Sequence, residues 1–178
     1  MEISTIAVIG AGRLGQRLAS LFSGAGYRTV LEDVLPSRLR KIANNGGADN
    51  DRLRFASSVD EAVREADLVI DCVPDELESK LEIFSMADRM APPRSILLTP
   101  TRSQSITDLA ACTYRPERCL SVEFPDTFLE ERAGEIRLVR TNFTDPAVMN
   151  AVAGLWEACG FDVTTVTDPV TSQAAARP

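Results

Sequence analysis

Three glycines near the amino terminus are spaced as G-x-G-x-x-G: Gly10, Gly12 and Gly15. An apolar run at residues 3–9 precedes them, and apolar residues at helical spacing follow them. In such a strand-to-helix turn Gly10 permits the tight bend, Gly12 leaves bare backbone beside a ligand, and Gly15 lets the helix pack closely on the strand. The unpaired N–H groups of the helix terminus favour an anion, so the turn predicts a site for a pyrophosphate.

Asp33 adds a second feature, because it closes the next predicted strand. A carboxylate there accepts hydrogen bonds from ribose hydroxyls and repels a 2′-phosphate, so NAD is the predicted cofactor in preference to NADP. Arg38 is the nearby residue that argues for NADP. Arg13 and Leu14, which open the helix, are expected to lie beside the phosphates. A flavin, and a fold of this type without a ligand, are the open alternatives.

The composition limits what else the chain can do. It has 178 residues, a formal net charge of −7, 44% hydrophobic residues, four cysteines and no histidine. The acidic balance argues against a nucleic-acid or anionic-membrane surface, and no apolar run reaches membrane-spanning length. Scattered cysteines and the lack of a signal peptide indicate a cytoplasmic protein. Without histidine or clustered cysteines, no metal site is expected.

Strand and helix patterns alternate along the chain. Strands are expected at residues 3–9, 28–33, 53–56, 67–73, 95–99, 119–124, 135–140 and 161–167. This order predicts an α/β, Rossmann-type doubly wound fold, with a mainly parallel sheet of about eight strands. One domain is expected over residues 1–168, followed by a flexible tail at 169–178. The strand at 135–140 alternates in polarity and is interpreted as a sheet edge available for a homodimer.

Three segments together resemble the NAD-binding domain of 3-hydroxyacyl-CoA dehydrogenases: IAVIGAGRLG, ADLVIDCVPDELESKLEIFSMADRMAPPRSILLT and SITDLAACTYRPERCLSVEF. The resemblance spans residues 3–168, and the family's ribose-binding acid matches Asp33. It implies an oxidoreductase of fatty acid metabolism, in which a 3-hydroxyacyl-CoA is oxidised to a 3-ketoacyl-CoA with NAD. Members of the family also carry a helical carboxyl-terminal domain that supplies dimer contacts and part of the substrate site.

The nicotinamide end of the cofactor site also has counterparts in this family. Asp75 stands where the family usually has a glutamate near the nicotinamide ribose, and Lys80 matches a lysine that contacts the cofactor. The alternative for Lys80 is a solvated ion pair with Glu76, four residues before it. Val73 and Pro74, at the end of the fourth strand, are expected to line the nicotinamide pocket.

The catalytic positions differ from the family. Its N-T-S-S loop reads P-T-R-S here, so that the asparagine is Pro100 and the substrate-binding serine is Arg102. The catalytic histidine of the family's G-L-H-F-F-N-P motif matches Glu123, and the asparagine of that motif matches Asp126. The acid that orients the histidine matches Glu135.

Oxidation of an alcohol by hydride transfer needs a base that takes the hydroxyl proton, and Glu123 is the candidate at the family's histidine position. A free glutamate has a pKa of about 4.3, a poor match for this step. Proximity to Glu135 would raise one of the two pKa values. Arg102 would act in the opposite direction, or close the pocket in an inert ion pair.

Three functional hypotheses therefore stay open. The first is an active NAD-dependent oxidoreductase that takes a small hydroxy acid or acyl thioester, with Arg102 binding a carboxylate or phosphate of the substrate. The second is a non-catalytic NAD(H)-binding module for regulation or docking, whose nicotinamide face a second copy or a partner protein covers. The third is one half of a split dehydrogenase with the helical domain on another chain.

Overall fold

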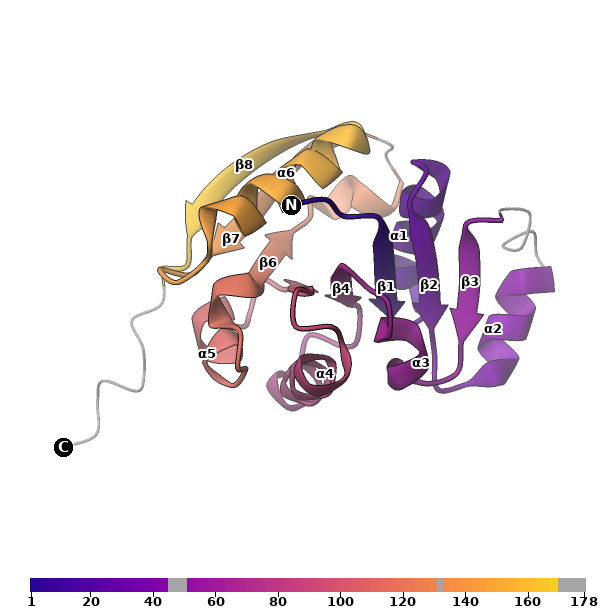
Figure 1. Ribbon diagram of the computed structural model, residues 1–178. Helices are drawn as coiled ribbons and strands as arrows, with labels where there is room; N and C mark the ends of the chain where they lie inside the picture. Colours follow the sequence, from indigo (N-terminus) through magenta and orange to yellow (C-terminus); the bar gives the residue numbers. More distant parts are fainter. Residues whose placement is uncertain (45–50, 131–132, 170–178) are drawn as a thin grey trace.

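The computed structural model describes residues 1–44, 51–130 and 133–169, which form one eight-stranded sheet in the order β3-β2-β1-β4-β5-β6-β7-β8 (Figure 1). The strands are β1 (Thr5–Ile9), β2 (Arg28–Glu32), β3 (Leu53–Ala56), β4 (Leu68–Asp71), β5 (Ile96–Pro100), β6 (Cys119–Glu123), β7 (Gly134–Arg140) and β8 (Phe161–Thr167). The helices are α1 (Arg13–Gly24), α2 (Pro36–Ile42), α3 (Val59–Val63), α4 (Leu77–Met90), α5 (Ile106–Ala111) and α6 (Pro146–Ala158), with 3₁₀ turns η2 (Pro116–Arg118) and η3 (Asp126–Leu129).

The strand pairing confirms the predicted fold class. Strands β1 to β6 pair in parallel, β7 is antiparallel to β6, and β8 is parallel to β7. The expectation that residues 135–140 form a sheet edge was wrong, because β8 covers the outer side of β7 along its whole length. Residues 170–178 of the expected tail lie outside the described residues.

Helices cover both faces of the sheet and bury a separate apolar core on each (Figure 1). The side chains of α1 and α6 pack on one face, and those of α3, α4 and α5 pack on the other. The strands are apolar on both faces because both are covered: Ile6, Ala7 and Val8 of β1 are all fully buried. No helix in the described part of the chain is long and apolar enough to cross a bilayer.

Helix starts follow local sequence. The Ser58 hydroxyl accepts the Glu61 backbone N–H at the start of α3, and the Ser105 hydroxyl accepts the Asp108 backbone N–H at the start of α5. Each side chain satisfies a donor that the first helical turn leaves unpaired. These caps fix where the two short helices begin.

The single tryptophan, Trp156 of α6, is fully buried in an aromatic cluster. Its ring centroid lies 5.3 Å from that of Phe22 in α1 and 5.3 Å from that of Phe124, which follows β6. These tilted and edge-on contacts are the favourable geometry for aromatic pairs. The cluster ties α6 to the first helix and to the loop after β6.

The turn between β1 and α1 is unusually tight. Gly10 has a φ of +99°, in the region that favours glycine, and a Cβ at position 15 would stand 1.8 Å from the Gly10 carbonyl oxygen. No side chain fits in that gap, so α1 leaves β1 along a path that only glycine at position 15 permits. The predicted roles of Gly10 and Gly15 in the turn agree with this geometry.

Substitution of Gly15 by alanine is therefore expected to destabilise the protein by about 3 kcal/mol, since the backbone must move to admit the methyl group. Gly154 is the matched control, because it also lies inside a helix and a Cβ there meets no atom within 4 Å. Gly154→Ala should stabilise the fold by about 0.5–1 kcal/mol. Urea unfolding of both variants measures the difference, and equal effects would contradict the close approach.

Candidate functional site

A cavity of about 770 Å³ lies at the carboxyl ends of β1, β2 and β4. Its walls come from the β1–α1 turn, the segment after β2, the loop after β4, and one side of α4. This is the edge at which parallel α/β sheets bind ligands, because helix N-termini and loops converge there. Eight of the ten predicted cofactor residues line it: Gly10, Gly12, Arg13, Leu14, Asp33, Val73, Pro74 and Asp75.

The amino terminus of α1 opens onto this cavity. Its N-cap is Gly12, so no side chain caps the helix, and a Cβ at position 12 would meet no atom within 4 Å. The backbone N–H groups of the first turn are thus left for a ligand, and the space beside them is large enough to admit one. This arrangement fits a diphosphate.

Asp33 connects β2 to the glycine turn. Its side chain is only 4% exposed; Oδ2 accepts the Ala11 backbone N–H at 3.1 Å and Arg38 Nη1 at 2.7 Å, and Oδ1 accepts the Leu35 N–H at 2.9 Å. Burial raises the pKa of Asp33, but these donors outweigh it and hold the pKa below its ordinary value. Asp33 is therefore ionised, and it has two roles: it orders the glycine turn, and it lines the cavity.

Glu32 is a second acid of the cavity, and the sequence analysis did not single it out. It is 2% exposed, and its Oε1 has no hydrogen-bond partner among the described residues. Burial, followed by the neighbouring Asp33 carboxylate, raises the pKa of Glu32 to about 7. The sequence signal for Glu32 was the pair of consecutive acids at the end of a strand. Because side chains alternate between the faces of a strand, Glu32 lies on the same face as Val30.

Asp75 is held at the other end of the cavity by the loop after β5. Its carboxylate accepts the Thr101 hydroxyl at 2.6 Å, the Ser103 hydroxyl at 2.9 Å and the Arg102 backbone N–H at 3.3 Å. Burial alone would raise the pKa of Asp75. These hydrogen bonds lower the pKa by more than burial raises it, so the pKa lies below its ordinary value. A fixed carboxylate thus lines this end of the cavity, and its contact with the nicotinamide ribose stays a prediction of the resemblance.

Lys80 lies beneath the cavity. It is fully buried; its Nζ lies 2.9 Å from Thr99 Oγ1, 3.3 Å from Asp71 Oδ2 and 3.9 Å from Asp75 Oδ1. The alternative of a solvated ion pair with Glu76 was therefore wrong. The α4 helix directs Lys80 into the sheet, where Asp71 and Thr99 from β4 and β5 surround it. Contact with the cofactor remains a prediction for Lys80, which is not among the residues that line the cavity.

Arg102 bridges the loops after β5 and β6. Its Nη1 lies 2.9 Å from Asp126 Oδ1, and its Nη2 donates to the carbonyl of Phe124. By the resemblance, Arg102 and Asp126 both replace uncharged residues of the family, so the new charges pair with one another. The expected approach of Arg102 to Glu123 is replaced by this contact.

Glu123 pairs with Arg137, its direct neighbour on β7, which the sequence analysis missed. Arg137 donates Nε at 2.9 Å to Glu123 Oε2, and its Nη2 donates to the same oxygen. Glu135 is exposed and stands opposite Asp162 of β8. The partner of Glu123 is thus an arginine of the antiparallel strand, rather than Glu135 or Arg102.

Comparison with known proteins identifies the domain. Residues 5–168 match the family described as 3-hydroxyacyl-CoA dehydrogenase, NAD binding domain. The chain belongs to this family. Its cofactor is therefore NAD(H), in agreement with the open α1 terminus, the buried acids at the carboxyl end of β2 and the size of the cavity.

The relatives of this dehydrogenase domain are longer proteins. The probable 3-hydroxybutyryl-CoA dehydrogenase of Bacillus subtilis is 32% identical over 142 residues, which are 70% of this chain and 49% of that protein. The 3-hydroxybutyryl-CoA dehydrogenase of Bradyrhizobium diazoefficiens is 30% identical over 168 residues, which are 84% and 56% of the two chains. The chain thus spans about half the length of these relatives.

Solved structures support the same fold. The 3-hydroxybutyryl-CoA dehydrogenase of Escherichia coli K12 superimposes with a TM-score of 0.82 at 24% identity, over 94% of this chain and 39% of that chain. At this identity the match carries the architecture and no functional detail.

Glu32 should make the stability of the domain depend on pH. Because its folded pKa of about 7 lies above its unfolded value, the folded state binds the proton more tightly, and stability falls as pH rises from about 4.5 to about 7. The loss is on the order of 3 kcal/mol. Urea unfolding of the wild type and Glu32→Gln at about pH 5 and pH 8 measures it. The unfolding free energy of Glu32→Gln, relative to that of the wild type, should be higher at about pH 8 than at about pH 5. The same difference at both pH values would contradict a raised pKa for Glu32.

Lys80→Met should cost about 3–5 kcal/mol of unfolding free energy, because Asp71 is left buried without its counter-charge. A solvated helix pair would be worth only about 0.3–0.5 kcal/mol. The double variant Lys80→Met/Asp71→Asn removes both charges and should recover much of the loss. Chemical unfolding of the single and double variants tests this, and a negligible cost for Lys80→Met would refute the buried network.

Proposed function

We propose that this domain binds NAD(H) in the cavity at the carboxyl ends of the strands, as the nucleotide-binding part of a 3-hydroxyacyl-CoA dehydrogenase-type oxidoreductase, and that these residues alone do not turn over substrate. One observation carries the second half of the proposal. Glu123, which stands at the position of the family's catalytic histidine, is engaged by Arg137.

The cofactor would lie along the cavity from the β2 side to the β5 side. The N–H groups around Gly12, Arg13 and Leu14 would bind the pyrophosphate, as the open helix terminus favours. Asp33 would bind the adenosine ribose, with Glu32 beside it, whose Oε1 has no partner in the part of the chain that the structure describes. When bound, NAD⁺ supplies a hydride acceptor.

The nicotinamide half would lie beside Val73, Pro74 and Asp75, which line the opposite end of the cavity. Lys80 fixes this end from below, since its amino group lies within 3.9 Å of Asp75 Oδ1. The residues at this end bind and orient, and none of them is a base of suitable strength: Asp75 is held ionised by its donors.

Proton transfer is the step for which the domain lacks a suitable group. An alcohol proton passed to Glu123 would cancel the ion pair with Arg137, and Arg102 is already committed to Asp126 and the Phe124 carbonyl. Arg137 thus ties Glu123 to β7 and Arg102 ties the two loops together, an arrangement that does not favour catalysis. This supports a cofactor-binding or docking domain, whose nicotinamide face a second copy, a partner protein or a separate helical domain covers.

The substrate of the complete oxidoreductase would then be an acyl thioester, after the 3-hydroxybutyryl-CoA dehydrogenases that resemble this chain. The second candidate function is catalysis by these residues alone with Glu123 as the base. Its support is the place of Glu123 at the carboxyl end of β6, the edge that also holds the cofactor cavity. A cytoplasmic location is part of the proposal.

NADH binding and turnover test the two halves of the proposal separately. The wild type should bind NADH, and Gly12→Val should weaken binding by at least about tenfold, because its side chain occupies the space beside the helix terminus. That space is empty of protein atoms, so the variant should still fold. Calorimetry measures the affinities, and unchanged NADH affinity in Gly12→Val would reject the assigned pyrophosphate site.

Turnover is measured with NAD⁺ and a panel of 3-hydroxyacyl thioesters and free hydroxy acids. The wild type and Glu123→Gln should both remain at background. Robust activity in the wild type that Glu123→Gln abolishes would establish Glu123 as the base and overturn the non-catalytic assignment.

A further inference from the structure

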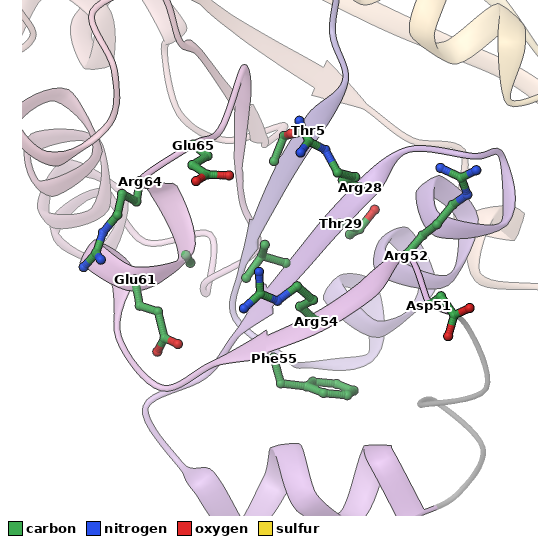
Figure 2. A pocket seen from close by; sticks show the side chains of 12 residues that line it. Thr5, Arg28, Thr29, Asp51, Arg52, Arg54, Phe55, Glu61, Arg64 and Glu65 are labelled. Atoms are coloured by element: carbon green, nitrogen blue, oxygen red, sulfur yellow. The ribbon is translucent and has the colours of Figure 1, made fainter.

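A second cavity, of about 340 Å³, lies away from the cofactor site (Figure 2). It is lined by the beginnings of β1 and β2, by β3, and by α3 with the residues that follow it. Thr5 and Arg28 are the first residues of their strands, whereas the cofactor cavity is at the opposite ends of those strands. The two cavities share no lining residue.

The cavity lies between one face of the sheet and α3, which has only five residues. Three neighbouring side chains of that face are polar. Thr5 of β1 is the register partner of Arg28 on β2, and Val30, two residues along β2, is the partner of Arg54 on β3. Because side chains alternate along strands, Thr5, Arg28 and Arg54 project to the same side.

The guanidinium groups of these two arginines have no partner in the described part of the chain. The backbone N–H of Arg28 donates to the Ser4 carbonyl at 3.0 Å, but neither side chain makes an ion pair or hydrogen bond within residues 1–44, 51–130 and 133–169, although the chain as a whole has a net charge of −7. By contrast, Arg64 on the rim pairs with Asp60 at 3.0 Å. Two adjacent, unneutralised guanidinium groups at a cavity wall favour an anion with planar oxygen acceptors.

Thr5 provides an independent indication of a ligand. It is 5% exposed, and its Oγ1 is a buried oxygen with no hydrogen-bond partner in the described part of the chain. Its backbone N–H donates to Asp67 Oδ2 at 3.1 Å, so the hydroxyl is the group left unsatisfied. Figure 2 shows this hydroxyl beside the Arg28 side chain. Buried polar groups are rarely left unpaired, and a ligand oxygen would complete this one.

The wall of the cavity opposite the two arginines carries acidic residues. Glu61 and Glu65, from α3 and the turn after it, line the side of the cavity opposite the strands, and one oxygen of Glu61 also accepts the Ser57 backbone N–H at 3.3 Å (Figure 2). A plain anion would be repelled by these carboxylates, whereas hydroxyl or amino groups would donate to them. The volume is at the lower end of the range for small-molecule sites.

We propose that this cavity binds a small metabolite whose phosphate or carboxylate is held by Arg28, Arg54 and the Thr5 hydroxyl, and whose hydroxyl or amino groups meet Glu61 and Glu65. The site is separate from the nucleotide cavity and does not depend on the function proposed for it. Since the lining residues differ, both sites are open to ligand at the same time.

Amide NMR and calorimetry at constant ionic strength test the site, with inorganic phosphate, hexose and pentose phosphates, phosphoserine, and hydroxylated mono- and dicarboxylates as probes. Saturating NADH is included in one arm, so that phosphate bound at the α1 terminus is distinguished. At least one organic probe should bind with a Kd below about 1 mM and shift the amides of Thr5, Arg28 and Arg54. Phosphate esters and carboxylates, compared at equal size, identify which anion is preferred.

Variants provide the decisive comparison. Arg28→Gln and Arg54→Gln should each weaken the probe by at least about tenfold, and Thr5→Val should weaken it several-fold while raising the thermal midpoint of the free protein. Arg89→Gln, an exposed arginine at the end of α4 outside both cavities, is the matched control and should bind as the wild type does.

The proposal is overturned if no probe shifts these amides at about 10 mM, or if binding persists in Arg28→Gln/Arg54→Gln as strongly as in Arg89→Gln. Shifts confined to the β1–α1 turn that NADH abolishes would also overturn it, because the anion would then be bound at the nucleotide cavity. Both arginine side chains are exposed, so the variants should fold.

Discussion

The departure of α1 from β1 is the constraint on which the site depends. The carbonyl of Gly10 occupies the space where a side chain at position 15 would begin, so the helix starts against the strand end and its first N–H groups remain open. Asp33 completes the arrangement from the neighbouring strand by accepting the Ala11 N–H. Local backbone geometry and one buried carboxylate thus create the cavity before any ligand is bound.

Charge is distributed unevenly around the two ends of that cavity. At the β2 end Glu32 keeps an oxygen without a donor among the described residues, although its neighbour Asp33 accepts three hydrogen bonds. At the β5 end the carboxylate of Asp75 accepts the hydroxyls of Thr101 and Ser103. An acceptor that is free for a ligand is therefore found at the β2 end of the groove. At the end where the resemblance places the chemistry, the acid is committed to protein donors, which is consistent with a domain that holds a cofactor for another surface.

Local signals made most of the fold predictable, because the strands, the glycine turn and the cap at Ser58 depend on neighbours in sequence. The failures involve partners that are distant in sequence. Lys80 has helical spacing from Glu76, but its contacts are Asp71 and Thr99 on two other strands. Arg137 meets Glu123 because β6 and β7 pair in antiparallel register. Strand β7 lies inside the sheet because β8 pairs with its other side.

The aromatic cluster around Trp156 connects the interior to the loop after β6, because Phe124 touches the indole through its ring and Arg102 through its carbonyl. With one tryptophan in the chain, all indole fluorescence originates at this contact. The fluorescence of Trp156 should therefore change if the contact of Arg102 with the Phe124 carbonyl, which joins the loops after β5 and β6, is lost, and no added label is needed to follow it.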